Sequence, residues 1–135
     1  MALPNGAGGY QVGDGNRNEP RIGYANAPQT ATSTATLTAA QVTGGLLVAN
    51  PSTSAATYTL PTAAAIDAVV TSATVGSTFD LSIVNTGTSS GAVTLAMGAG
   101  ITDGGNAAVA VAVTSSAAFR FRKTGDGAWS VYKIA

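Results

Sequence analysis

The sequence predicts a mainly β fold, with an antiparallel β-sandwich or jelly-roll-like body over residues 35–135, one or two short helices, and an extended N-terminal arm over residues 1–34. Two observations predict this class. Stretches in which apolar and polar residues alternate recur roughly every 8–14 residues, as in sandwiches and barrels. The segments between them are rich in the turn formers Gly, Asn and Ser. The pattern does not choose between a jelly-roll and an immunoglobulin-like topology.

Residues 1–34 are assigned to the arm because they show no periodic apolar pattern. Gly and Pro are frequent there, and both interrupt helices and interior strands. The arm also carries two tyrosines and four charged residues, which are Tyr10, Tyr24, Asp14, Arg17, Glu19 and Arg21. This composition is also typical of a free tail. We adopt the other hypothesis, an extended arm that lies on the surface of a partner.

The body begins with a helix-start signal. Thr38 can cap a single helical turn over residues 39–42, which Gly44 and Gly45 end. The short apolar run over residues 46–49 then precedes an Asn-Pro turn signal and is expected to form a strand.

The next stretch predicts a strand and then the most convincing helix of the chain. Residues 56–60 alternate and are rich in β-formers. Thr62 is a second N-cap, for a helix over residues 63–71. Its apolar face has helical spacing and consists of Ile66, Val69 and Val70.

The remainder of the chain is typical of strands. They are expected over residues 78–84, 93–97, 108–113, 119–122 and 129–134. Their inward residues are expected to be Phe79, Leu81, Ile83, Val93, Leu95, Met97, Val109, Val111, Val113, Phe119 and Phe121. Residues 98–106 are expected to form a long loop, and Thr-Gly-Asp-Gly at 124–127 signals a hairpin.

Composition excludes several classes of function. The chain has no Cys and no His, so it has no disulfide framework, no thiol nucleophile and no imidazole base or ligand. Six basic and six acidic residues cancel, which argues against nucleic-acid binding. No apolar run is long enough for a membrane span, and the N-terminus does not resemble a signal peptide. The core is rich in Ala, so we expect oligomerisation or docking to add stability.

The candidate chemical motifs favour no enzyme, cofactor or metal. Residues 14–19 begin like a calcium loop, but Glu19 and Ala25 stand where Gly and Glu belong. Gly98 and Gly100 are interpreted as turn residues because no P-loop context surrounds them. The carboxylates lie on different predicted elements, so no catalytic pair is expected.

The dense basic cluster of the body consists of Arg120, Arg122 and Lys123. One interpretation is a solvated strand face whose charges protect a sheet edge. The other is an electrostatic contact with an acidic partner surface. We keep these three residues as a candidate interface.

Four segments carry a resemblance to a known family. They are TLPTAAAIDA at 59–68, GSTFDLSIVN at 76–85, FRFRKTG at 119–125 and WSVY at 129–132. In these segments the chain resembles head decoration (cement) proteins of short-tailed phages, including cyanophages. The resemblance covers roughly residues 36–135 and leaves out the arm.

The resemblance implies a small, cofactor-free virion protein, often a homotrimer, on the outer capsid surface. Its partners would be the major capsid protein and sister copies, with no nucleic acid and no membrane. The arm would add contact area on the capsid, and the residues expected to do so are Leu3, Pro4, Tyr10, Arg17, Glu19, Arg21 and Tyr24.

An alternative function is a phage fibre, spike or receptor-binding β-module that holds glycans in a shallow groove. Trp129 and Tyr132 are the candidate sugar-binding side chains. A single Trp in a closing strand is more typical of core packing, and we favour that interpretation.

Overall fold

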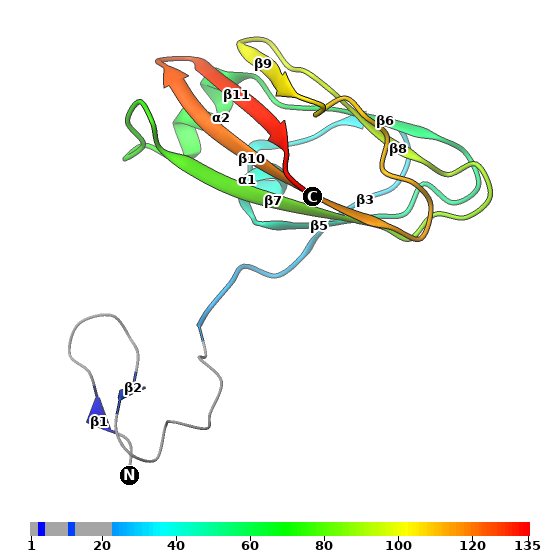
Figure 1. Cartoon of the computed structure of the whole chain (residues 1–135), viewed down its shortest axis with the longest axis horizontal. Helices are drawn as coiled ribbons and strands as arrows, with labels where there is room; N and C mark the ends of the chain where they lie inside the picture. The colour runs from blue at the N-terminus through cyan, green and yellow to red at the C-terminus, as the bar shows by residue number, and fades with distance from the viewer. Residues whose placement is uncertain (1–2, 5–10, 13–22) are drawn as a thin grey trace.

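The computed structural model describes residues 3–4, 11–12 and 23–135, which confirm a mainly β chain with two short helices (Figure 1). The helices are α1 (Ala39–Thr43) and α2 (Ala63–Val69). The strands of the body are β3 (Gln29–Ala31), β4 (Ala35–Thr36), β5 (Leu46–Ala49), β6 (Ala56–Thr59), β7 (Thr78–Asn85), β8 (Val93–Ala96), β9 (Ile101–Gly105), β10 (Ser116–Gly125) and β11 (Ala128–Lys133). In the arm, β1 (Leu3–Pro4) pairs antiparallel with β2 (Gln11–Val12).

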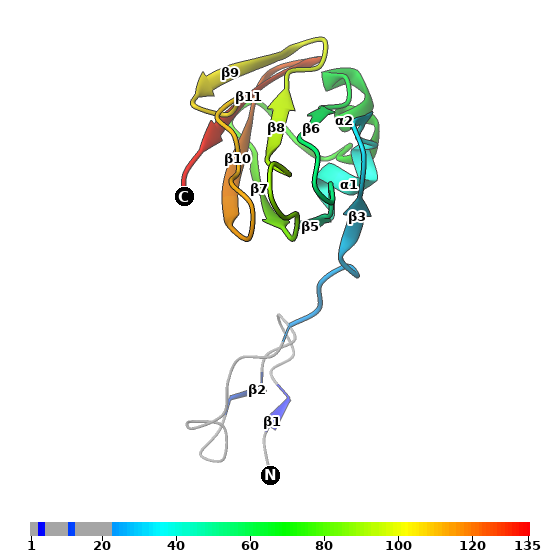
Figure 2. The same cartoon turned by 90° about the vertical axis from the view of Figure 1, so that its right-hand side faces the viewer.

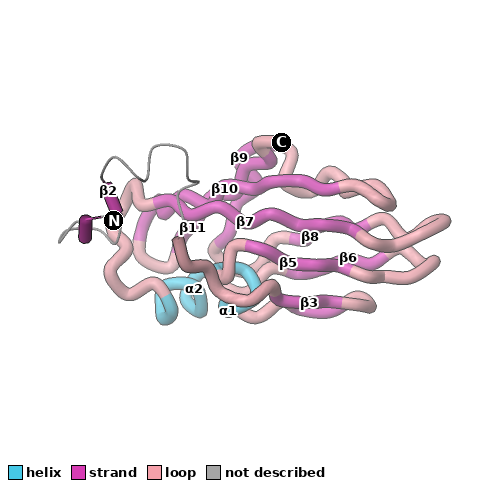
Figure 3. The backbone as a smooth tube through the Cα atoms, turned by 90° about the horizontal axis from the view of Figure 1, so that it is seen from below, coloured by secondary structure: helices cyan, strands magenta, loops and turns pink. Residues whose placement is uncertain are grey.

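The body has two layers. One is a six-stranded sheet in the order β3-β5-β7-β10-β11-β9, and the other is a three-stranded sheet in the order β4-β6-β8. Figure 3 shows β3, β5, β7 and β10 side by side, with β6 and β8 in the second layer and both helices at one end. A sandwich-like body is therefore what the described residues form.

The chain reaches this arrangement by winding between the two sheets. We call each passage a coil: β3, β4 and α1 form the first, β5, β6 and α2 the second, and β7 and β8 the third. Equivalent strands of successive coils pair in parallel, in the order β3–β5–β7 in one sheet and β4–β6–β8 in the other. Figure 2 shows β6 and β8 of the smaller sheet beside the helices.

The mainly β, sandwich-like class is confirmed, but the antiparallel pairing expected for it holds for only part of the body. Antiparallel pairing in the body is confined among the described strands to β10 with its neighbours β7 and β11, apart from one isolated bridge. Parallel neighbours need a long crossover between them. In the six-stranded sheet each crossover is a strand of the opposite sheet followed by a short helix. The sequence pattern predicted the strand and helix of the second crossover, β6 and α2, but not the parallel pairing that they allow.

The hairpin of β10 and β11 interrupts the stack of parallel strands. It lies between β7 and β9, and β9 pairs in parallel with β11. Gly127 has a positive φ of 64°, as the predicted hairpin turn requires. The hairpin thus occupies the place next to β7 that a further coil would otherwise take.

The core lies between the sheets and combines few large side chains with many small ones. Phe79 stacks on Phe121 with ring centroids 4.7 Å apart and meets Trp129 edge-on at 5.3 Å. The largest side chains that are almost fully buried are Trp129, Tyr58, Phe119, Phe121, Leu47, Leu60, Ile66, Leu81, Ile83, Leu95, Val42 and Val93. Burial of Trp129 confirms the core-packing interpretation.

Both predicted helix starts are confirmed. Thr38 accepts a hydrogen bond from the Gln41 backbone N–H, and the Gln41 side chain accepts one from the Thr38 N–H. Thr62 accepts from the Ala65 N–H. The second helix is shorter than expected and ends at Val69, which is 52% exposed, so Val69 does not share the buried face of Ile66.

Two expectations for residues 98–113 are wrong. The expected long loop contains β9, which forms because the backbone of β11 offers a parallel partner, not because its sequence alternates. The repeated Ala-Val segment forms no extended strand. Val111 is buried and bridges to Val93, whereas Val109 is 52% exposed. The segment therefore pairs with β8 at Val111 alone, and the alternation of Ala and Val does not place its other valines on one buried face.

The boundary between arm and body also differs from the expected one. Gln29–Ala31, assigned to the arm, forms β3 and pairs in parallel with β5. The Tyr58 hydroxyl donates to the Thr32 carbonyl at 2.6 Å and ties this segment to the second coil. Residues 29–34 therefore belong to the body.

Glycine allows the backbone to pass close to itself before and after β8. A Cβ on Gly98 would lie 2.3 Å from the Leu60 carbonyl oxygen and 2.4 Å from that of Pro61. A Cβ on Gly91 would lie 2.4 Å from the Ser52 carbonyl oxygen. These contacts are with backbone atoms of the second coil, so no side-chain rotation can relieve them.

We predict that Gly98→Ala destabilises the protein by about 1–3 kcal/mol, because the methyl group forces the second and third coils apart. Urea unfolding measures the change in free energy. Gly125→Ala is the matched control, since its Cβ would meet the Ala128 methyl group at an ordinary 3.8 Å. Equal urea midpoints for Gly98→Ala and Gly125→Ala would show that the close contact between the second and third coils does not contribute to stability.

Candidate functional site

The candidate site is the outer face of the six-stranded sheet. Strand alternation puts Phe119 and Phe121 inside, so Arg120 and Arg122 point outward. By the same alternation and the pairing register, the outer face is formed by Leu46, Val48, Thr78, Asp80, Ser82, Val84, Ser116, Ala118, Arg120, Arg122, Ser130 and Tyr132.

A bidentate ion pair crosses this face. Arg120 donates from Nε to Asp80 Oδ1 at 2.8 Å and from Nη2 to Oδ2 at 3.0 Å. The two residues are register partners on β10 and β7, and about half of each side chain is exposed. The hydrogen bonds and charge of Arg120 lower the pKa of Asp80, and Asp80 in turn raises the pKa of Arg120.

Arg122 and Tyr132 flank this ion pair. Arg122 is exposed and forms no ion pair within residues 23–135. Tyr132 lies opposite Arg120 on β11. Its ring covers the neighbouring strand closely, because a Cβ on Gly104 would lie 2.5 Å from the ring. The row therefore presents an ion pair, a half-buried aromatic ring and a guanidinium group without an ion-pair partner among residues 23–135.

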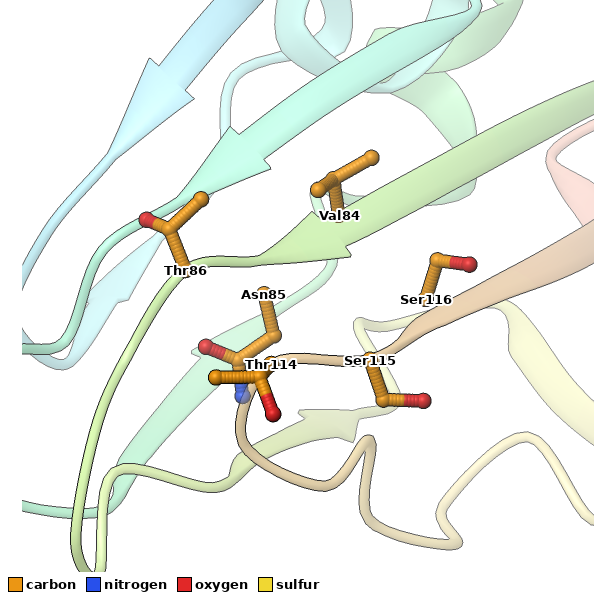
Figure 4. A pocket seen from close by; sticks show the side chains of 6 residues that line it. All are labelled: Val84, Asn85, Thr86, Thr114, Ser115 and Ser116. Carbon is orange, nitrogen blue, oxygen red and sulfur yellow. The ribbon is translucent and has the colours of Figure 1, made fainter.

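Beside this row runs a strip of aliphatic side chains, which are Leu46, Val48, Val84 and Ala118. Each is only half-buried, although it belongs to the central strands of the sheet. The strip leads to an open hollow lined by Val84, Asn85, Thr86, Thr114, Ser115 and Ser116 (Figure 4). Hydroxyl groups surround the apolar Val84 there.

Asn85 shapes the hollow. Its Nδ2 donates to the carbonyls of Gly91, Val111 and Ala112 at 2.9–3.1 Å, and its Oδ1 accepts from the Gly87 N–H. The side chain thus joins the loop after β7 to the segment before β10. The sequence pattern does not reveal this role of Asn85, because its long-range carbonyl partners give no local signal.

Lys123 does not belong with the two arginines. It is one residue out of phase with them, points inward and is 6% exposed. Its Nζ lies 3.1 Å from Asp67 Oδ1 and 3.8 Å from Asp126 Oδ1. The solvated-face interpretation of Lys123 is therefore wrong, and two carboxylates expected to be unrelated meet at one amine.

Asp67 is the centre of this second cluster, which joins α2 to the hairpin. Its Oδ2 accepts from the Gly127 N–H at 2.7 Å and its Oδ1 from the Trp129 Nε1–H at 2.8 Å. These two hydrogen bonds, followed by the effect of Lys123, lower the pKa of Asp67. The indole of Trp129 is buried against this cluster, so it offers no surface to a glycan.

The arm residues proposed as an interface are only partly described. Leu3 and Pro4 form β1, and Tyr24 is fully exposed. Tyr10, Arg17, Glu19 and Arg21 lie outside the described residues.

Within the described residues, no cluster of three or more acidic, His or Cys side chains could hold a metal ion. Neither helix in the described part of the chain is long and apolar enough to span a membrane. No family model, curated protein or solved structure matches the chain.

We predict that Arg120→Ala raises the pKa of Asp80 toward its ordinary value, because the charge-assisted hydrogen bonds that favour the ionised carboxylate are lost. The stability that this pair contributes is present above the unfolded-state pKa of Asp80. It is lost as pH falls through the lowered folded-state value. NMR titration of the Asp80 carboxyl carbon measures the shift. Arg122→Ala should leave the titration unchanged, and an equal shift in both variants would contradict the pairing.

Proposed function

We propose that the chain is a non-enzymatic virion structural protein that decorates and stabilises the phage capsid exterior by binding the major capsid protein and sister copies. The observation that carries the proposal is the outer face of the six-stranded sheet. It combines half-buried aliphatic side chains with arginines and a half-buried tyrosine.

This combination is typical of protein–protein interfaces. Their centres are apolar and well packed, their rims are polar, and Arg and Tyr are enriched among the residues that contribute most. On the outer face, Leu46, Val48 and Val84 would form the centre and Arg122 the rim. Arg122 would meet an acidic group of the capsid protein, because it has no ion-pair partner in the described part of the chain.

The three-stranded sheet presents a different surface. Its outward residues include Thr36, Thr57, Thr59 and Thr94, a composition typical of a solvated strand face. The contrast between the two sheets supports the assignment of the docking role to the six-stranded one. It also supplies control positions for mutagenesis.

The arm is proposed to extend the contact on the capsid. Tyr24 is fully exposed where the chain leads from the arm to the body, as an aromatic side chain that becomes buried on docking would be. The ordering of an extended segment costs about 1–2 kcal/mol per residue and must be offset by contacts with the partner. Assembly as a homotrimer would place three arms on one capsid site and raise avidity.

The glycan-binding alternative is weaker than the docking role. Of its two candidate side chains, Trp129 is buried and hydrogen-bonded to Asp67, which leaves Tyr132 alone on the surface. A sugar platform usually needs an exposed ring face, whereas Tyr132 is packed on Gly104.

We predict that Arg122→Glu weakens binding to capsids about tenfold or more, because it places like charges against each other at the interface. The measurement is co-sedimentation with empty heads of the phage whose genome encodes the chain. Thr57→Glu, which introduces the same charge on the other sheet, is the matched control. Binding lost equally in both variants, or in neither, would contradict docking through the outer face.

We also predict that a protein lacking residues 1–22 keeps its fold but binds heads more weakly than the full chain, because it loses the contact area of the arm. Circular dichroism reports the fold and co-sedimentation the affinity. Binding at full strength by the folded, shortened protein would remove the arm from the interface.

A further inference from the structure

We propose that Lys123 and Asp67 react to form an intramolecular isopeptide bond between Nζ and Cγ, with Asp126 as the carboxylate that transfers the proton. The inference is independent of the proposed function. It follows from three groups at one point: an amine, a carboxyl group held by hydrogen-bond donors, and a second carboxylate beside the amine.

The reacting groups are already in contact. Lys123 Nζ lies 3.1 Å from Asp67 Oδ1, and its side chain is only 8% exposed. The Ala73 carbonyl, 3.4 Å from Nζ, also accepts a hydrogen bond from the amine and directs it toward the carboxyl group. The pair joins the middle of α2 to β10, so neither partner can move away without disrupting an element of secondary structure. Such proximity replaces a bimolecular encounter by a unimolecular step.

Aromatic residues border Lys123 on the inner face of the sheet. Lys123 is on the inner face of β10 next to the Phe121 position, opposite Trp129 in the register. Phe79 packs on both of these rings. The hydrogen bonds that lower the pKa of Asp67 favour its ionised form, so the reaction starts from the minor form of the pair, in which one proton has passed from the amine to the carboxylate.

The carboxyl group of Asp67 is held as an acyl-transfer site requires. The Gly127 backbone N–H and the Trp129 indole N–H each contact one carboxyl oxygen, at 2.7 and 2.8 Å. Donors in these positions stabilise the negative charge that develops on oxygen when the amine adds to Cγ. The hairpin turn supplies one donor and the core supplies the other, so both are fixed before reaction.

The reaction balances without a co-reactant. The Lys123 amine adds to Cγ of the protonated Asp67, and its surplus proton passes to Asp126, whose Oδ1 lies 3.8 Å from Nζ. Asp126 returns this proton to the departing hydroxyl of Asp67. The C–O bond breaks, water leaves through the exposed Asp126 side, and an amide remains. An ammonium ion and a carboxylate have become an amide and one water molecule, with no change in oxidation state.

The bond would add a covalent cross-link to a core that contains few large side chains. The chain has no cysteine, so no disulfide can fulfil this role. A link from residue 67 to residue 123 closes a loop that includes the third coil, β9 and most of β10. Closing a loop of this length restricts the unfolded chain, as a disulfide does.

The intact mass of the purified full chain, measured after denaturation, tests the inference. We expect a mass lower than that of the sequence by one water molecule. Trypsin gives a second readout, because it does not cleave after an acylated lysine. The peptide of residues 124–133 should be missing, and a branched species joining residues 22–120 to residues 123–133 should replace it.

The variants separate the proposed roles. Lys123→Met should have its full mass and no branched peptide, and Asp80→Ala, which breaks the exposed ion pair, should retain the bond. Asp126→Ala changes an exposed turn residue and should accumulate the bond at least tenfold more slowly. Full mass in the native chain, with quantitative release of residues 124–133, would show an ion pair only and overturn the proposal. Undiminished bond formation in Asp126→Ala would overturn the role of Asp126.

Discussion

The close packing of successive coils is the constraint on which the rest of this structure depends. The core has few large side chains, so the two sheets and their connections must approach closely to exclude water. They do so at positions such as Gly91 and Gly98, where a single methyl group would collide with backbone atoms. The abundance of small residues is therefore a requirement of the fold and not a sign of disorder. Once the coils are stacked, strand alternation determines which side chains form the candidate docking surface.

Local features of the fold could be predicted from the sequence, and pairing could not. Thr38 and Thr62 predict where the two helices begin, because an N-cap is a local hydrogen bond. Phe119 and Phe121 face inward as expected because alternation is also local. The parallel stacking depends on which strands meet, and β9 becomes a strand only because β11 lies beside it. No residue within β9 carries that information.

The candidate site shows the same division. Alternation predicted that Arg120 and Arg122 share an exposed face, and the structure adds Asp80 as the partner that the register supplies. Lys123 was misplaced because adjacency in sequence was taken for adjacency in space. In a strand the next residue points to the opposite side of the sheet. On that side Lys123 meets Asp67, which belongs to α2 and precedes it by 56 residues in the sequence. Long-range contacts of this kind, including those of Asn85, leave no mark on the local pattern.

The most direct test of the account is an electron cryo-microscopy map of heads saturated with the protein. The account predicts that each body is seated with β5, β7 and β10 against the capsid, that the three-stranded sheet faces solvent, and that density for the arm continues along the capsid surface. Bodies attached through the three-stranded sheet, or heads that carry no added density at saturating protein, would contradict it.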